Sequence, residues 1–231
     1  MNSAKKIPLH IDWQQIDTVL LDMDGTLLDR HFDDYFWHCY VPENYALLHD
    51  LEIEEARRRL RSAYDNQEGT LAWTNLDYWS EQLGLDIPEL KRRVDALVDV
   101  HPHVVDFLEF CRKNDKMIYL VTNAHHKTLA IKMAKAALNG YWDQAVCAEQ
   151  IGQAKEEAAF WPRLERHLGY DKQRTLLVDD TERVLDQANA YGLKYLVHVA
   201  RASSRAPHRF SAKYPSIVFF NELISGSSQQ L

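Results

Sequence analysis

The stretch Thr18-Val-Leu-Leu-Asp-Met-Asp-Gly-Thr26 decides the fold class of this 231-residue chain. It begins as a short apolar run and ends in acid, a pattern typical of a buried parallel strand that ends at Asp22. Because residues two apart on an extended chain face the same way, Asp22 and Asp24 can converge on one ligand. Gly25 lets the chain turn and approach that ligand closely. The stretch therefore predicts a strand that delivers two carboxylates to one edge of a parallel sheet.

The same apolar pattern recurs along the chain and alternates with helical patterns. Four more strands are expected, of which the second is the weakest: Met117–Thr122, Ala145–Cys147, Thr175–Asp179 and Tyr195–Val199. Four helices are expected between them: Val104–Asn114, Lys127–Leu138, Glu156–Leu168 and Glu182–Tyr191. Gly169 and Gly192 stand where helix C-caps would put them. The alternation predicts an α/β fold, a Rossmann-like parallel sheet with helices on both faces.

The interval from Asp29 to Val100 breaks this alternation. It contains no convincing apolar strand, and its charge patterns are helical. An all-helical insertion directly after the first strand is expected to be a cap domain. We therefore divide the chain into a core, residues 1–28 and 101–231, and a helical cap, residues 29–100.

Composition excludes several classes of protein. The chain is 46% hydrophobic and 26% charged, as in ordinary globular proteins, and its net charge of −7 argues against binding to nucleic acid polymers. No run approaches the ~18 apolar residues of a membrane span. Cys39, Cys111 and Cys147 are far apart, so we expect reduced thiols in a cytoplasmic protein. No obligate protein partner is indicated.

Polar residues end three of the predicted strands, at Asp22, Thr122 and Asp179. In an open α/β sheet the ligand crevice lies outside the carboxyl ends of the strands. Asp179 and the adjacent Asp180 can complete an oxygen cage around the first acids, and such a cage suits Mg²⁺. Because like charges repel at close range, this clustering is costly without a cation. The acids therefore indicate a metal site rather than simple strand-ending turns.

Four motifs in this order resemble those of the haloacid dehalogenase (HAD) superfamily: Asp22-Met-Asp-Gly-Thr26, Leu120-Val-Thr-Asn123, Lys155 and Val178-Asp-Asp-Thr181. The helical insertion resembles the C1 cap of that superfamily. The true dehalogenases lack the second aspartate of the first motif, whereas Asp24 is present here. The resemblance therefore favours a phosphatase with a HAD-like core.

The resemblance implies a role for each motif residue. Asp22 would be the nucleophile that forms an aspartyl-phosphate, and Asp24 the general acid and base. Thr122, Asn123 and Lys155 would bind the phosphoryl oxygens of a small-molecule phosphomonoester.

The resemblance also implies how Mg²⁺ would be held. Its ligands would be the Asp22 carboxylate, the Asp24 backbone carbonyl and the acids of the fourth motif. Many relatives carry a further acid four residues after the fourth-motif aspartate, but that position is Val184 here. We favour Asp180 as the direct ligand and Asp179 as a water-mediated one, and the reverse assignment stays open.

The substrate is expected to be set by the cap. Tyr35-Phe-Trp37, Val41-Pro-Glu43 and Leu76-Asp-Tyr-Trp79 resemble bacterial purine 5′-nucleotidases of this superfamily, which act on GMP and IMP. Trp37 and Tyr40 are the candidates to line the substrate site, although the aromatic residues can equally form the cap's own core. Alternative functions are a HAD phosphosugar phosphatase or phosphomutase and, least favoured, a catalytically idle HAD-like binding protein.

Histidines lie near two of these features. His125 and His126 follow the phosphate-binding motif, but a supporting or surface position is expected because the implied mechanism already has its acid and base. The His101-Pro-His103 stretch is expected at the junction of cap and core, without a metal.

Overall fold

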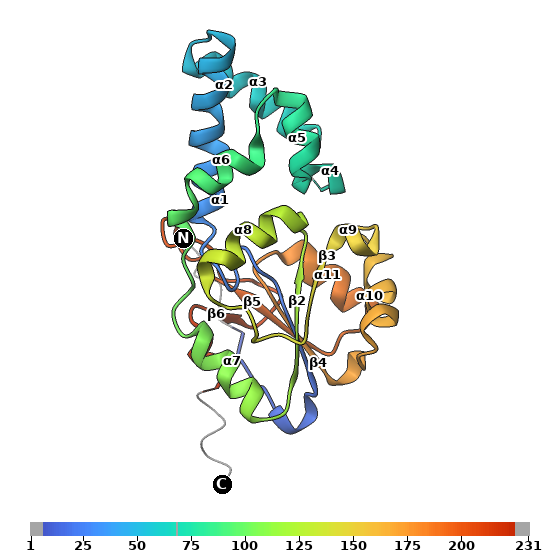
Figure 1. Cartoon of the computed structure of the whole chain (residues 1–231). Coiled ribbons are helices and arrows are strands. Elements are labelled where there is room, and N and C mark those ends of the chain that lie inside the picture. Colours follow the sequence, from blue (N-terminus) through green and yellow to red (C-terminus); the bar gives the residue numbers. More distant parts are fainter. Residues whose placement is uncertain (1–6, 68, 225–231) are drawn as a thin grey trace.

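The computed structural model describes residues 7–67 and 69–224 and has an α/β architecture (Figure 1). Six strands form one sheet in the order β3-β2-β1-β4-β5-β6, and every neighbouring pair is parallel. The strands are β1 (Thr18–Leu21), β2 (Met117–Thr122), β3 (Gln144–Cys147), β4 (Thr175–Asp179), β5 (Tyr195–Val199) and β6 (Ser216–Ile217). The predicted parallel sheet is confirmed, with the first strand at its centre.

Helices cover both faces of the sheet, which explains why β1 is buried along its whole length. Val19 and Leu21 face one hydrophobic core, and Leu20 faces the other. The helices of the first face are α7 (Val104–Lys113) and α8 (His126–Ala136). Those of the second face are α9 (Ala148–Ile151), α10 (Phe160–Leu168) and α11 (Glu182–Tyr191).

Residues 30–99, here called the helical segment, contain no strand in their described part. Its helices are α1 (His31–Tyr35), a π-helical turn (Phe36–Tyr40), α2 (Val41–His49), α3 (Ile53–Asp65), α4 (Leu71–Thr74), α5 (Leu76–Leu83) and α6 (Ile87–Arg93). They share a hydrophobic core of their own around Trp79, and Figure 1 shows them grouped together beyond α8.

The helical segment leaves and rejoins the α/β part through two neighbouring stretches of chain. Leu28 and Val100 form an antiparallel bridge. The Asp29 N–H donates to the Asp99 carbonyl at 2.9 Å, and the His101 N–H donates to the Leu27 carbonyl at 2.9 Å. The two crossings therefore run side by side.

The remaining helical elements of the described residues are short 3₁₀ helices: Trp13–Gln15, Asp95–Leu97, Lys172–Arg174 and Phe220–Leu223. None of the helices in the described part of the chain is long and apolar enough to span a membrane.

The structure differs from the predicted elements in two places. The helix expected from Glu156 begins only at Phe160, because residues 152–159 form turns that carry Lys155 to the sheet edge. The strand β6 was not predicted, since its two residues are too short to give an apolar pattern. The predicted C-caps at Gly169 and Gly192 are confirmed by their left-handed backbone, with φ of 73° and 99°.

Candidate active site

The sheet register explains why the first-motif and fourth-motif acids meet. Leu21 of β1 lies level with Leu120 of β2 and with Val178 of β4. Asp22 and Asp179, each one residue further on, therefore leave the two central strands side by side. The candidate site lies at this carboxyl edge of the sheet.

Lys155 occupies the space between these acids. Its Nζ donates to Asp22 Oδ1 at 2.5 Å, to Asp179 Oδ2 at 2.7 Å and to the Val121 carbonyl at 3.2 Å. The residue is only 2% exposed. Burial alone would lower the pKa of Lys155, but the carboxylates of Asp179 and Asp22 outweigh it and raise that pKa. Lys155 is therefore a permanent cation at the centre of the site.

Asp22, Asp179 and Asp180 each place a carboxylate oxygen within 4.8 Å of the other two. Burial raises the pKa of Asp22 to about 6, and burial together with the Asp22 and Asp179 carboxylates raises that of Asp180 well above its usual range. With Lys155 these acids form what we call the Lys155 cluster, in which three carboxylates face one buried ammonium. Its excess negative charge and all-oxygen donor set suit a hard divalent cation.

The two fourth-motif acids differ in the partners of their carboxylate oxygens. Asp179 accepts from Lys155 with Oδ2 and from the Thr181 N–H with Oδ1, at 2.9 Å. Asp180 Oδ2 pairs at 3.1 Å with Arg30, whose side chain is 43% exposed. An exposed arginine is displaced more easily than a buried lysine, so Asp180 is the acid better placed for direct coordination.

Gly25 is required by this arrangement for two reasons. Its φ of +86° is strained for any other residue. A Cβ at this position would also lie 2.5 Å from Asp180 Oδ2. The close approach expected of Gly25 is thus an approach to the fourth-motif carboxylate.

Asp24 points to a different partner. Its carboxylate pairs with Lys132 of α8, and Lys132 pairs in turn with Asp33 of α1. Lys91 of α6 donates to Asp33 Oδ1 at 2.9 Å. In this Lys132 cluster, two carboxylates face two ammonium groups that are each 1% exposed. Although burial raises the pKa of Asp24 to about 6, the cluster is balanced without a cation.

Sequence reasoning missed Lys132, Asp33, Lys91 and Arg30. A signal existed for the two lysines, because both lie on apolar helix faces: Lys91 follows Ile87 by four residues, and Lys132 follows Leu129, which packs against the core, by three. A lysine in such a place is either shielded by its stem or paired, and both of these are paired.

Thr122 and Asn123 connect the second motif to the third. Thr122 Oγ1 accepts from the Ala124 N–H at 3.0 Å, which shapes the turn after β2. Asn123 Oδ1 accepts from the Lys155 N–H at 2.9 Å, and Asn123 Nδ2 donates to Glu156 at 2.8 Å. Asn123 and Lys155, two of the residues expected to contact phosphate, are thus joined by a hydrogen bond, while Thr122 orders the turn that carries Asn123.

A cavity of about 290 Å³ lies over these residues, and residues of the helical segment line its other side. From the α/β part it is lined by Asp22, Asp24, Thr122, Asn123, Lys155 and Asp180. From the helical segment it is lined by Asp33, Trp37, His38, Trp73 and Lys91, among others.

The two aromatic candidates of the helical segment are placed differently. Trp37 lines this cavity and also a neighbouring cavity of about 630 Å³. His38 and Trp73 likewise line both cavities. Tyr40 is not among the described residues that line either cavity. Its ring stacks instead on Tyr35, with centroids 6.2 Å apart.

The comparisons with known proteins agree with this geometry. A family model described as haloacid dehalogenase-like hydrolase matches residues 16–191. The chain is 37% identical over 216 residues to the GMP/IMP nucleotidase YrfG of Escherichia coli, which covers 94% of this chain and 97% of that protein.

Two solved structures show the fold alone. A HAD phosphatase from Thermococcus onnurineus has a TM-score of 0.76 at 22% identity, covering 90% of this chain and 96% of that one. A putative β-phosphoglucomutase from Thermotoga maritima has a TM-score of 0.64 at 18% identity, covering 94% and 100%. On the family match and the extended identity, the chain belongs to the haloacid dehalogenase-like hydrolases.

Proposed function

We propose that this protein is a cytoplasmic, Mg²⁺-dependent phosphatase that hydrolyses purine 5′-nucleotides, GMP and IMP above all, to nucleosides. One observation carries the chemistry: Asp22 and Asp24, two residues apart, pair with different buried lysines, Lys155 and Lys132. Asp22 belongs to the acid-rich Lys155 cluster, whereas Asp24 belongs to the balanced Lys132 cluster. Burial raises the pKa of both carboxyls to about 6, so the support for different roles comes from their different partners.

Asp22 is the nucleophile in this proposal. Its carboxylate attacks the phosphorus atom, and the ester P–O bond breaks as an aspartyl-phosphate forms. Lys155, Thr122 and Asn123 bind the phosphoryl oxygens as negative charge shifts among them. Asp22, the Asp24 carbonyl and Asp180 would hold Mg²⁺, with Asp179 acting through water, and the bound ion would supply further positive charge to nucleophile and phosphate alike.

Asp24 completes both half-reactions by moving one proton. It gives its proton to the nucleoside oxygen as that group leaves, and it then takes a proton from the water that attacks the aspartyl-phosphate. Since its pKa is raised to about 6, the carboxyl can be protonated and deprotonated near neutral pH. The cycle ends with free phosphate, a nucleoside and the original state of both aspartates.

The helical segment acts as the cap in this proposal. The proposed cap comprises residues 29–100, one residue more at each end than the helical segment, and the proposed core comprises residues 1–28 and 101–231. The purine base would stack on Trp37, with Trp73 across the shared cavity wall. The E. coli relative named above as a GMP/IMP nucleotidase supports a purine, because the identity to it extends over 94% of this chain. Free thiols at Cys39, Cys111 and Cys147 fit a reducing compartment.

Phosphate release from GMP, IMP, pyrimidine monophosphates and sugar phosphates, in Mg²⁺ or in EDTA, tests the proposal. We expect GMP and IMP to be preferred, EDTA to abolish turnover, and Asp22→Asn to lower kcat on the order of 10⁴–10⁶-fold. Preference for a sugar phosphate would replace the substrate but keep the chemistry. Isomerisation of glucose phosphates without phosphate release would instead indicate a mutase.

Activity retained in Asp22→Asn would overturn the site itself. The matched control is Asp12→Asn, an exposed aspartate before the first strand that caps a single turn. This variant should keep full activity, because it changes the same chemical group outside the site.

A further inference from the structure

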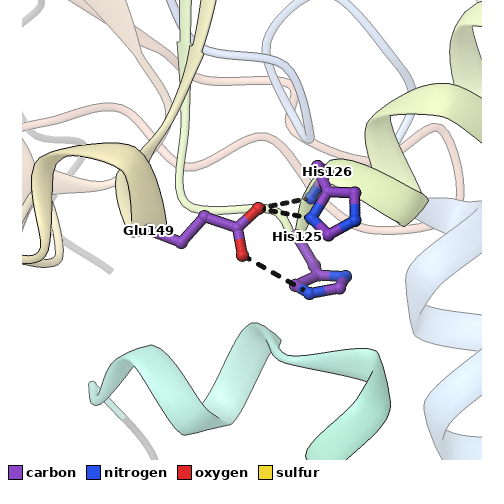
Figure 2. Close-up of side chains that lie close together, drawn as sticks. All are labelled: His125, His126 and Glu149. Atoms are coloured by element: carbon purple, nitrogen blue, oxygen red, sulfur yellow. Dashed lines mark hydrogen bonds and ion pairs between the residues drawn. The ribbon is translucent and has the colours of Figure 1, made fainter.

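A second group of metal-type donors lies at the same sheet edge, outside the Lys155 cluster. It consists of His125 and His126 at the start of α8 and Glu149 in α9, and we call it the histidine site (Figure 2). Thr122 of β2 pairs in register with Cys147 of β3. The loops that follow these neighbouring strands therefore emerge together, and the fold itself brings the three side chains to one place.

The donor atoms converge on one carboxylate. Glu149 Oε1 lies 2.8 Å from His126 Nδ1, and Glu149 Oε2 lies 3.4 Å from His125 Nε2. All three donor atoms lie within 4.8 Å of one another. In a tetrahedral zinc site with bonds of about 2.0–2.1 Å, ligand atoms are roughly 3.4 Å apart. Small rotations of the side chains would bring these donors to that spacing.

The carboxylate is held in place before any cation binds. The backbone N–H of His126 donates to Glu149 Oε1 at 3.0 Å, which fixes this oxygen at the first turn of α8. His126 is 61% exposed and Glu149 33% exposed, so an ion can reach them from solvent. The site is therefore partly preorganised and accessible.

His125 is the buried member of the site. Its side chain is only 4% exposed, and its Nε2 faces Glu149. The ligand atom is therefore held in place by packing, on the side of the ring that faces the other two donors. Burial also lowers the pKa of His125, which keeps the ring in the neutral form that binds metals.

We propose that the histidine site binds one borderline divalent transition-metal ion, such as Zn²⁺, through His125 Nε2, His126 Nδ1 and Glu149. Two imidazoles and one carboxylate are a donor set that proteins use for zinc. The Lys155 cluster, built from carboxylates alone, suits a hard cation instead. The protein thus carries two cation sites of different chemistry at one edge of its sheet.

Occupancy of the histidine site would tie the loop after β2 to α9. This loop also carries Asn123, whose side chain bonds to the third motif. On its other side, Lys127 of α8 pairs with Asp77 of α5 in the helical segment. A bound ion would therefore reduce motion in a stretch that contacts both the candidate active site and the helical segment.

Zn²⁺ binding to the full chain, measured by competition with a chromophoric chelator in excess Mg²⁺, tests the proposal. We expect one tight equivalent in the unaltered protein and a loss of affinity of roughly tenfold or more in His126→Ala and in Glu149→Gln. His49→Ala removes another exposed histidine, in α2, and should bind as the unaltered protein does. Asp180→Asn should also leave the zinc affinity unchanged.

Three results would overturn the proposal: equal zinc affinity in all variants, loss of zinc binding in Asp180→Asn, or no binding in the unaltered protein. The first would leave adventitious surface binding only, and the second would assign the ion to the Lys155 cluster. Co²⁺ absorption gives a second readout, since a tetrahedral or five-coordinate nitrogen and oxygen site absorbs visible light far more strongly than hydrated Co²⁺. Unfolding curves of the metal-free variants will show that each is folded.

Discussion

Two buried lysines, Lys155 and Lys132, pair with Asp22 and Asp24 respectively, and each also pairs with a second carboxylate. The carboxylates at Lys155 both come from the ends of central strands. Those at Lys132 come from two parts of the chain, since Asp24 belongs to the α/β part and Asp33 to the helical segment. Similar pairings therefore serve different purposes: one assembles the candidate reaction centre, and the other joins the helical segment to it.

The charge balance makes the same distinction. Three carboxylates face one buried lysine in the Lys155 cluster, which leaves an excess of negative charge for a cation to neutralise. Two carboxylates face two lysines in the Lys132 cluster. A buried network is stable only when its charges are paired, so a divalent cation should matter to the first cluster and not to the second.

Replacement of each lysine by methionine should give the largest effect, and it tests whether the two clusters differ in their response to Mg²⁺. Lys155→Met leaves Asp22 and Asp179 without their buried ammonium partner, and Lys132→Met does the same to Asp24, while Asp33 keeps Lys91. Each variant should lower the free energy of unfolding in EDTA by about 3–5 kcal/mol. Mg²⁺ should restore much of this loss in Lys155→Met, because the ion can neutralise the same carboxylates. It should restore little in Lys132→Met. Urea unfolding with and without Mg²⁺ measures both.

Equal recovery of the two variants in Mg²⁺ would contradict the charge argument. The control is Lys135→Met, which removes a lysine of the same helix as Lys132 whose side chain is 45% exposed and pairs with Asp95. Its unfolding free energy should change by less than about 1 kcal/mol, with or without Mg²⁺.

The second effect concerns turnover and tests the proposed role of Lys155. In the proposed mechanism Lys155 faces the oxygens on which charge develops, so Lys155→Met should lower kcat roughly 10²–10³-fold at saturating Mg²⁺. Steady-state phosphate release at several substrate concentrations gives kcat and KM separately. A change in KM alone would show that Lys155 contributes only to ground-state binding.

Sequence reasoning found Lys155 and missed Lys132 for a physical reason. Lys155 stands in an ordered set of motifs, and the apolar strands that position its partners can be recognised because they are buried on both faces. Lys132 becomes a functional candidate through its pairing with Asp24 and Asp33, and Lys91 through Asp33, partners that are all distant in the sequence. Tertiary contact of this kind has no local signature apart from a lysine on an apolar helix face.

Prediction of the fold from sequence has the same limit, because short or locally irregular elements leave no clear pattern. The central strands were predicted within a residue or two, whereas β6 was missed and the start of α10 was placed four residues too early. In the helical segment, the aromatic residues could be either core or lining from sequence. The structure places Phe36 and Trp79 fully in the core and leaves Trp37 between core and cavity.

The third effect is smaller and sharpens the role of Lys132 as a link. A double-mutant cycle of Asp33→Asn and Lys132→Met should give a coupling of about 1–3 kcal/mol in unfolding free energy, because the pair is buried. The control is the pair Asp77 and Lys127, which joins the same helix to α5 but is 57% and 41% exposed. Its coupling should stay below about 1 kcal/mol. Equal couplings would show that burial does not distinguish the two links.

The last and smallest effect is the pH dependence of Mg²⁺ stabilisation. Burial, with a contribution from the Asp179 carboxylate, raises the pKa of Asp22 to about 6, above the ~3.9 of an unfolded aspartate. Without metal, the folded protein therefore holds a proton that the unfolded chain has lost, and stability falls as pH rises from about 4 to 6.

Mg²⁺ binds the ionised acid and must displace this proton below pH 6. The gain in unfolding free energy on adding Mg²⁺ should thus increase by about 1.4 kcal/mol per pH unit for each proton displaced, and level off above pH 7. Thermal unfolding at fixed Mg²⁺ across this range measures the gain, and the same gain at pH 5 and pH 7 would mean that the cation does not bind at Asp22.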